Sequence, residues 1–269
     1  MPYKSHEIMQ EPQETQSLWR YMDFSKFVAL MQTKNLFFSP LTRLEDDPWE
    51  GLPSKKNFDP ELIVRIQDVG PSSTDGSIVE GNLPTNIRFA SLKNLFGDHL
   101  DDFLEEKKQS AFKLRNLFSV SCWHMNDDES DSQWKIYGSS PCALAIVTSF
   151  KRLREAIIDS HDVYGSKVIY YNPSKTPIPE GNAFLPVMFK RQAFIHEREF
   201  RLINCNFELI NSKTPPTGIP IAVDLDKLIE SVVISPRAPQ WFTDVVERFI
   251  TDSGFSIPIS KSNLLESPI

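Results

Sequence analysis

The chain has 269 residues and a formal net charge of −7, with 40% hydrophobic, 11% aromatic and 24% charged residues. That length suffices to bury one large core or two small ones, and the composition is that of a folded globular protein rather than a disordered one. An acidic chain lacks the basic surface needed for binding along a phosphate backbone. Broad nucleic-acid coating is therefore excluded, whereas a local basic groove is not.

The cysteines and the apolar runs indicate the compartment. Cys122, Cys142 and Cys205 have no metal-ligand spacing and lie among apolar residues, which favours free thiols in a reducing environment. No run approaches the ~18 apolar residues of a transmembrane helix, and residues 1–7 lack the apolar centre of a signal peptide. We therefore expect a cytoplasmic protein without a membrane partner, and the oligomeric state stays open.

The N-terminal part begins with a polar segment, residues 1–17, which is expected to be flexible. Residues 18–21 predict a short strand that carries Arg20 between two aromatic side chains. A helix follows, capped by Asp23 or Ser25, because either side chain can accept from the first turn. A second short strand comes next. The guanidinium of Arg20 suits a two-pronged grip on phosphate or carboxylate, or it extends to water.

The acidic loop after the second strand contains Asp46, Asp47 and Glu50 around Trp49. Hard divalent cations take oxygen ligands, so a cation site is one interpretation. The glycine spacing of a calcium loop is missing, which favours a structural turn in which Asp46 or Asp47 caps the backbone and Trp49 packs.

An insertion is predicted over about residues 52–115. Its first part is rich in Pro, Gly, Ser and Asp around one apolar patch at 62–66, interpreted as a short helix. From residue 86 onward, apolar residues recur at helical spacing, and Gly97 is expected to divide that segment into two helices.

The remainder mixes strands and helices without the regular alternation of a doubly wound sheet. The predicted strands are 117–123, 143–147, 167–171, 219–223, 231–234 and 255–259. The predicted helices are 133–137, 150–158, 183–191 and 239–253. This order predicts an α+β fold, with one domain over residues 18–269 that has mixed, mostly antiparallel sheets and flanking helices.

Two hydroxyl side chains stand out on the strand at 117–123. Ser119 and Ser121 share one face, because side chains two apart on a strand point the same way. They are either the exposed side of an antiparallel sheet or part of a site. Trp123 directly follows and is typical of a pocket wall. On the next short helix Trp134 is expected in the core, and the hydroxyl of Tyr137 is a candidate to reach the site.

A second charged segment, residues 190–203, contains Glu197, Glu199 and Arg201. If the strand begins by Glu197, all three share one face. Paired carboxylates repel each other unless a cation or hydroxyl lies between them. The segment is either a solvated edge strand or a catalytic carboxylate strand in which Arg201 supports Glu199.

Several short motifs together resemble a widespread family of uncharacterised microbial proteins, a domain of unknown function with members in mobile-element or phage-defence settings. The similarity covers about residues 18–205, with Gln133 where Met is expected before the Trp. It lies in Trp19–Arg20–Tyr21, Asp47–Pro48–Trp49–Glu50–Gly51, Cys122–Trp123–His124 and Glu197–Arg198–Glu199–Phe200–Arg201. This family implies no activity by itself.

A remote resemblance concerns mono-ADP-ribosyltransferases of the Arg–Ser–Glu class. Arg20, the Ser119–Val120–Ser121 strand and the Glu197–Arg198–Glu199 strand match that class in type and order, with Val120 in place of the usual Thr. The resemblance implies an ADP-ribosyltransferase-like fold, NAD as the substrate and a protein or nucleic-acid acceptor.

The same resemblance implies the roles of individual residues. Glu199 contacts the ribose and the oxocarbenium-like cation, and Glu197 orients the acceptor nucleophile. Ser119 holds the ribose or Glu199. The residues expected to bind NAD are Arg20 on a phosphate, Ser121, and Trp123 or Tyr137 on nicotinamide.

Three functional hypotheses follow. The first is an ADP-ribosyltransferase-like enzyme that cleaves the nicotinamide glycosidic bond of NAD, as a toxin or phage-defence effector, and it requires Arg20, Ser119 and Glu199 in one cleft. The second is a non-catalytic module that binds a nucleotide or partner, which is preferred if those residues are scattered. The third is a metal-dependent nuclease that uses Asp46, Asp47 and Glu50 with Glu197.

Overall fold

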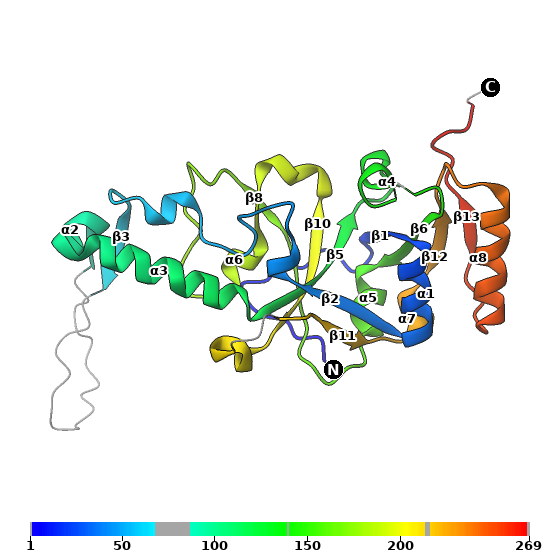
Figure 1. Ribbon diagram of the computed structural model, residues 1–269, viewed down its shortest axis with the longest axis horizontal. Helices are drawn as coiled ribbons and strands as arrows, with labels where there is room; N and C mark the ends of the chain where they lie inside the picture. The colour runs from blue at the N-terminus through cyan, green and yellow to red at the C-terminus, as the bar shows by residue number, and fades with distance from the viewer. Residues whose placement is uncertain (1, 68–86, 139, 213–215, 268–269) are drawn as a thin grey trace.

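The computed structural model describes residues 2–67, 87–138, 140–212 and 216–267. Its centre is a nine-stranded sheet in the order β11-β2-β5-β1-β6-β12-β13, with β10 paired to β5 and β7 paired to β10 (Figure 1). Every pairing in this sheet is antiparallel except that of β12 with β13. The prediction of a single α+β domain with a mixed, mostly antiparallel sheet is confirmed at that level.

The elements lie close to the predicted ones along most of the chain. The strands of the main sheet are β1 (Ser17–Asp23), β2 (Asn35–Pro40), β5 (Phe118–Met125), β6 (Ala143–Ser149), β7 (Tyr164–Lys167), β10 (Glu199–Cys205), β11 (Ile219–Ala222), β12 (Ser231–Ile234) and β13 (Ile259–Lys261). The helices around it are α1 (Phe24–Thr33), α4 (Asp131–Tyr137), α5 (Phe150–Ala156), α6 (Leu185–Met188), α7 (Leu225–Leu228) and α8 (Gln240–Asp252). Asp23 caps α1 by accepting from the backbone N–H of Lys26, as predicted.

The sheet forks at β5. Strand β10 pairs along one edge of β5, from His124 to Phe118. The other edge is shared, because β1 pairs with its end at His124 and Met125 whereas β2 pairs near its start at Ser119 and Val120. Ser121 lies on β5 between these two pairings, at the place where β1 and β2 diverge.

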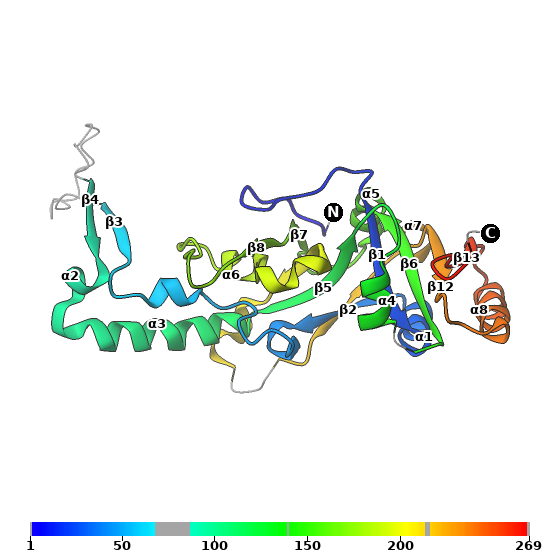
Figure 2. The same ribbon diagram turned by 90° about the horizontal axis from the view of Figure 1, so that it is seen from above.

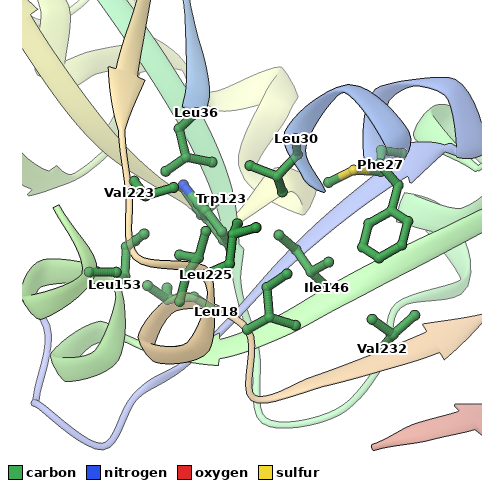
Figure 3. Packing of buried hydrophobic residues seen from close by; sticks show 14 of the residues in the cluster. Leu18, Phe27, Leu30, Leu36, Trp123, Ile146, Leu153, Val223, Leu225 and Val232 are labelled. Carbon is green, nitrogen blue, oxygen red and sulfur yellow. The ribbon is translucent and has the colours of Figure 1, made fainter. Parts of the chain in front are cut away.

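The two faces of the sheet are covered differently. On one face α1, α5, α7 and α8 enclose the largest apolar cluster, which includes Leu18, Trp123 and Ile146 from the strands (Figure 3). The other face carries α4 and α6 over smaller apolar clusters. Charged side chains occupy the space between those two helices, so the second face holds the polar interior of the protein.

The segment before β1 is packed, which corrects the prediction of a flexible N-terminus. Tyr3 is buried and its backbone forms a bridge with Val163, and Gln10 receives the backbone N–H of Lys167. The ring of Tyr3 lies against Gly165, where a Cβ would come within 2.5 Å of the Tyr3 hydroxyl. The polar composition of this segment concealed the apolar contact that holds it.

An arm projects from the body of the molecule, at the predicted insertion (Figure 2). It consists of η2 (Lys55–Phe58), the hairpin of β3 (Ile63–Gln67) and β4 (Ile87–Ser91), α2 (Leu92–Phe96) and α3 (Leu100–Arg115). The division near Gly97 is confirmed, since a 3-10 turn over Gly97–His99 separates the helices. The short helix predicted at 62–66 is wrong, because that segment pairs as β3 with β4.

Two boundaries later in the chain also differ. The helix predicted over 183–191 is only α6, because the next residues form β9 (Phe189–Arg191), which pairs in parallel with β8 (Ile169–Tyr171). The last strand lies later than predicted, at β13. Among the described residues, no helix is both long enough and apolar enough to span a membrane.

Candidate functional site

The carboxylates of Glu197 and Glu199 lie close together, although the two residues are not on one strand as the sequence pattern predicted. Strand β10 begins only at Glu199, and Glu197 ends the preceding 3-10 helix η4 (Gln192–Glu197). Between them Arg198 has φ = 41°, in the left-handed region that few non-glycine residues adopt. This bend turns both carboxylates toward the ammonium of Lys190, which contacts Glu197 and lies 3.2 Å from Glu199 Oε2.

Arg201 holds Glu199 in a two-pronged ion pair. Its Nε donates to Glu199 Oε1 at 2.8 Å and its Nη2 donates to Oε2 at 3.0 Å. The Nη1 atom donates to Glu50 at 2.5 Å and to the carbonyl of Val187 at 2.6 Å. The side chain of Arg201 is 0% exposed. Arg201 is thus a support for Glu199, as the sequence suggested, and it also fixes the acidic loop.

Lys190 and Glu50 complete the group, here named the ion cluster: Glu50, Lys190, Glu197, Glu199 and Arg201. Glu50 Oε2 lies 3.7 Å from the Lys190 ammonium. The side chains of Glu50 and Glu199 are 1% and 5% exposed, whereas that of Glu197 is 11% exposed. Glu197 is therefore the carboxylate of the cluster that is nearest to solvent.

The two neighbouring glutamates have opposite pKa shifts. Burial raises the pKa of Glu197, and the charge of Glu199 adds to that effect while Lys190 opposes it. Burial also works to raise the pKa of Glu199, but the charges of Arg201 and Lys190 outweigh it and hold that pKa well below its usual range. Glu199 therefore stays ionised to lower pH than Glu197, and Glu197 is the carboxyl of the pair that takes up a proton first as the pH falls.

His124 adds an imidazole beside the ion cluster. Its ring Nδ1 lies 2.6 Å from the carbonyl of Glu197, and a carbonyl only accepts, so Nδ1 carries the proton. Burial lowers the pKa of His124, which keeps the ring neutral. Its Nε2 is buried and has no hydrogen-bond partner in the described part of the chain. A neutral imidazole with a free lone pair has the form of a general base.

Three further side chains border the cluster. Tyr170 accepts the backbone N–H of Glu199 at 2.9 Å, and the thiol of Cys122 hydrogen-bonds the Glu199 carboxylate. Burial raises the pKa of the Tyr137 hydroxyl, and the charge of Glu197 adds to that effect. Because Tyr137 is nevertheless 46% exposed, it connects the cluster with solvent. Trp134, on the same helix, is buried as predicted.

The acidic loop is a turn locked onto this site. The Oδ1 of Asp47 accepts the backbone N–H of Trp49 at 3.0 Å and lies 2.8 Å from Arg191 Nε. This bears out the interpretation of Asp47 as a turn residue. In the part of the chain that the structure describes, no group of three His, Cys, Asp or Glu residues is arranged to hold a metal ion. Of the carboxylates in the proposed nuclease site, Glu50 and Glu197 contact Lys190, whereas Asp47 pairs with Arg191.

The other predicted site residues lie on the opposite face of the sheet. Residues paired directly on neighbouring strands point to the same face. Arg201 pairs with Cys122, whereas Ser121 pairs with Leu202 and Ser119 pairs with Asn204. Ser119 and Ser121 therefore face away from Glu199 and Arg201. The single cleft required by the ADP-ribosyltransferase hypothesis is not formed by these residues.

Arg20 and Trp123 belong to that opposite face. Arg20 donates to Ser121 Oγ at 2.8 Å and to the carbonyl of Phe37 at 3.4 Å, so it bridges the fork of the sheet. Its guanidinium lies 5.6 Å from the centre of the Trp123 ring. Trp123 is 1% exposed within the apolar core, which leaves it no free ring face for nicotinamide.

Sequence reasoning missed one member of the site and undervalued two others. Lys190 stands in the charged segment that was singled out, but it received no role. Glu50 was joined to Glu197 only in the metal-site hypothesis, and His124 was named only within the Cys122–Trp123–His124 motif. The sequence did offer one indication that Lys190 belongs to the site. Two closely spaced carboxylates that become buried require buried cations beside them.

In comparisons with protein-family models, curated proteins and solved structures, the chain matches none.

Proposed function

We propose that the chain is an acid–base enzyme that cleaves a glycosidic bond, with Glu197 as the carboxyl that exchanges the proton. The observation that carries this proposal is the pair Glu197 and Glu199, whose pKa values are shifted in opposite directions within one cluster. Opposite pKa shifts in two neighbouring carboxyls are typical of sites where one carboxyl transfers a proton and the other stays charged. The proposal does not use Arg20 or Ser119, which lie on the other face.

The charge of the ion cluster suits a reaction that develops positive charge. Three carboxylates, Glu50, Glu197 and Glu199, surround two cations, Lys190 and Arg201, which leaves one net negative charge when all are ionised. Glycoside cleavage passes through an oxocarbenium-like state that a nearby preorganised negative charge stabilises. Glu199, held by Arg201, acts as a positioning residue for Lys190 and Glu197.

NAD is the substrate that the resemblance to ADP-ribosyltransferases suggests. Nicotinamide leaves as a neutral ring when its bond to ribose breaks, so the leaving group needs no proton. The acceptor, water or a hydroxyl of a macromolecule, bonds to the ribose carbon and gives its proton to ionised Glu197. Tyr137, half-exposed beside Glu197, is placed to border the substrate. An ADP-ribosyltransferase-like fold belongs to the same proposal.

Release of nicotinamide from NAD tests the proposal, with NAD alone and with NAD plus cell lysate. Glu197→Gln keeps the size of the side chain and is expected to slow cleavage by about 100-fold or more, because a general acid–base contributes on that scale. Glu247→Gln, on the exposed face of α8, is the matched control and is expected to retain full activity. The proposal fails if wild type releases no nicotinamide and transfers no label, or if Glu197→Gln keeps its rate.

A second candidate function rests on Arg20. Its guanidinium has five N–H donors, yet the described contacts are one hydroxyl and one distant carbonyl, and no ion pair joins it to an acidic residue of the described chain. A cation without an acidic partner at the fork of a sheet favours binding of an anion such as a nucleotide phosphate. This corresponds to a non-catalytic nucleotide-binding module.

Calorimetric titration with NAD and ADP-ribose separates the two candidates. If binding occurs at the fork, Arg20→Met abolishes it while Glu197→Gln leaves it unchanged. If binding occurs at the ion cluster, Glu197→Gln abolishes it while Arg20→Met leaves it unchanged. Binding that survives both substitutions contradicts both candidates.

A further inference from the structure

A pocket of about 320 Å³ lies where the arm joins the body, on neither of the two sites described above. Its walls are α3 and the stretch of chain at 178–186, and Figure 1 shows α3 running from the arm toward β5. The inner wall is apolar, formed by Ala111, Leu114, Phe118 and Ile178. This volume lies at the lower end of the range of small-molecule sites, roughly 300–1,000 Å³.

One cation lines this pocket without an acidic partner. Arg115, the last residue of α3, donates through Nη2 to the carbonyl of Leu41 at 3.0 Å. Its Nε is buried and has no hydrogen-bond partner among the described residues. Arg115 lines the pocket and is only partly buried, and no ion pair joins it to an acidic residue of the described chain, so its guanidinium can take a further acceptor from a ligand.

The acidic groups near Arg115 have other cations as their ion-pair partners. Asp47 and Glu50 are the carboxylates whose charges act on its guanidinium. Asp47 is paired with Arg191, and Glu50 with Arg201. Neither forms an ion pair with Arg115 in the described part of the chain. The positive charge of Arg115 therefore remains available to a ligand.

The backbone beside Arg115 is fixed by close packing. Gly51, which lines the pocket, has φ = 70°, and a Cβ there would lie 2.7 Å from Leu41 Cδ1 and 3.4 Å from Arg115 Cγ. A side chain at this position would clash with Leu41, whose carbonyl accepts from Arg115. That hydrogen bond fixes one end of the guanidinium at the pocket wall.

We propose that this pocket binds a small carboxylate with an apolar body, the carboxylate on Arg115 and the body against Leu114, Phe118 and Ile178. At about 30 Å³ per water-sized group, the volume accommodates on the order of ten such groups. At the rim the ammonium of Lys107 is occupied by Glu180 at 2.6 Å and by the carbonyl of Asn57 at 3.0 Å, so Arg115 is the anion-binding group. This proposal does not depend on the activity proposed for Glu197.

The test is calorimetric titration of the full chain with butyrate, benzoate, 3-phenylpropionate and octanoate, each compared with its neutral amide. We expect at least one carboxylate to bind at least tenfold more tightly than its amide, since a charge-assisted hydrogen bond is lost in the amide. Arg115→Met is expected to abolish that preference. Lys113→Met, an exposed cation on the same helix, is the control and is expected to preserve it.

A second variant keeps the test decisive if Arg115→Met unfolds the arm. Ser110 is exposed and lines the pocket, so Ser110→Trp fills the entrance without removing a buried group. It is expected to weaken carboxylate binding at least tenfold while circular dichroism stays unchanged. The proposal is overturned if no carboxylate binds in preference to its amide, if the preference persists in Arg115→Met, or if folded Ser110→Trp binds as wild type does.

Discussion

The two faces of the sheet around β5 carry one arginine each, in opposite electrostatic settings. Arg201 contacts two carboxylates, and their charges outweigh the effect of burial and raise its pKa above the ordinary value. Arg20 contacts a serine hydroxyl and a carbonyl, and burial lowers its pKa. The same side chain is therefore a structural counterion on one face and an uncompensated cation on the other.

Because of this difference, we expect a different function on each face of the sheet. On the ion-cluster face the cations are already matched by carboxylates, so proton transfer at Glu197 is favoured over binding of an anion by a free cation. On the fork face the missing carboxylate favours anion binding. Substitutions that remove one charge at a time test whether the two faces differ in this way.

The largest effect is expected for Arg201→Met. This change leaves Glu199 and Glu50 buried with one cation fewer, and removing one partner of a buried ion pair typically costs about 3–5 kcal/mol in the free energy of unfolding. Chemical denaturation monitored by circular dichroism measures it. The control Arg248→Met, on the exposed face of α8, is expected to cost less than about 0.5 kcal/mol. A loss below about 1 kcal/mol for Arg201→Met would show that the cluster does not hold the fold together.

A smaller loss, about 2 kcal/mol at neutral pH, is expected for Glu199→Gln, which keeps the shape but removes the charge. Because the native pKa of Glu199 lies below its ordinary value, its ionisation stabilises the fold above that value, and the contribution is lost as the pH falls through the native pKa. The variant should therefore lose less stability than wild type on acidification. Denaturation at a series of acidic pH values checks this, and parallel curves would contradict it.

Arg20→Met is expected to cost only about 1 kcal/mol, since Arg20 has neutral acceptors and no carboxylate is left unpaired. The loss should also be independent of pH between neutrality and mild acid. If Arg20→Met proved as costly as Arg201→Met, the two faces would not differ in the way described above.

The smallest effect is expected for Glu197→Gln, below about 1 kcal/mol near neutral pH, because a carboxyl whose native pKa is raised contributes little to stability once it is ionised. The native pKa of Glu197 is raised, so its contribution is present below the ordinary value and is lost as the pH rises through the native pKa. The variant should therefore flatten the decline of stability with rising pH. A steeper decline than in wild type would contradict the assigned direction.

The sequence predicted local structure better than assembly. Strand and helix periodicity located β5, β12, α1 and α8, because each has its own apolar pattern. The carboxylate pair was found for a partly mistaken reason, since Arg198 breaks the strand that was expected to align it. No local pattern told whether Ser119 lies on the same face as Glu199, because that depends on the register between β5 and β10. Lys190 was missed because only the fold brings β9 next to the carboxylate pair.

The position of β1 has a consequence for how the chain folds during synthesis. Strand β1 is made long before its two neighbours, since Trp19 pairs with His124 on β5 and with Val147 on β6. Such distant pairing delays folding, because the chain between the strands must close into a loop before the contacts can form. The nascent β1 therefore stays unpaired until β5 has been translated, and one of its edges stays open until β6 follows. Its apolar side chains, Leu18 among them, make it the segment on which a chaperone would act.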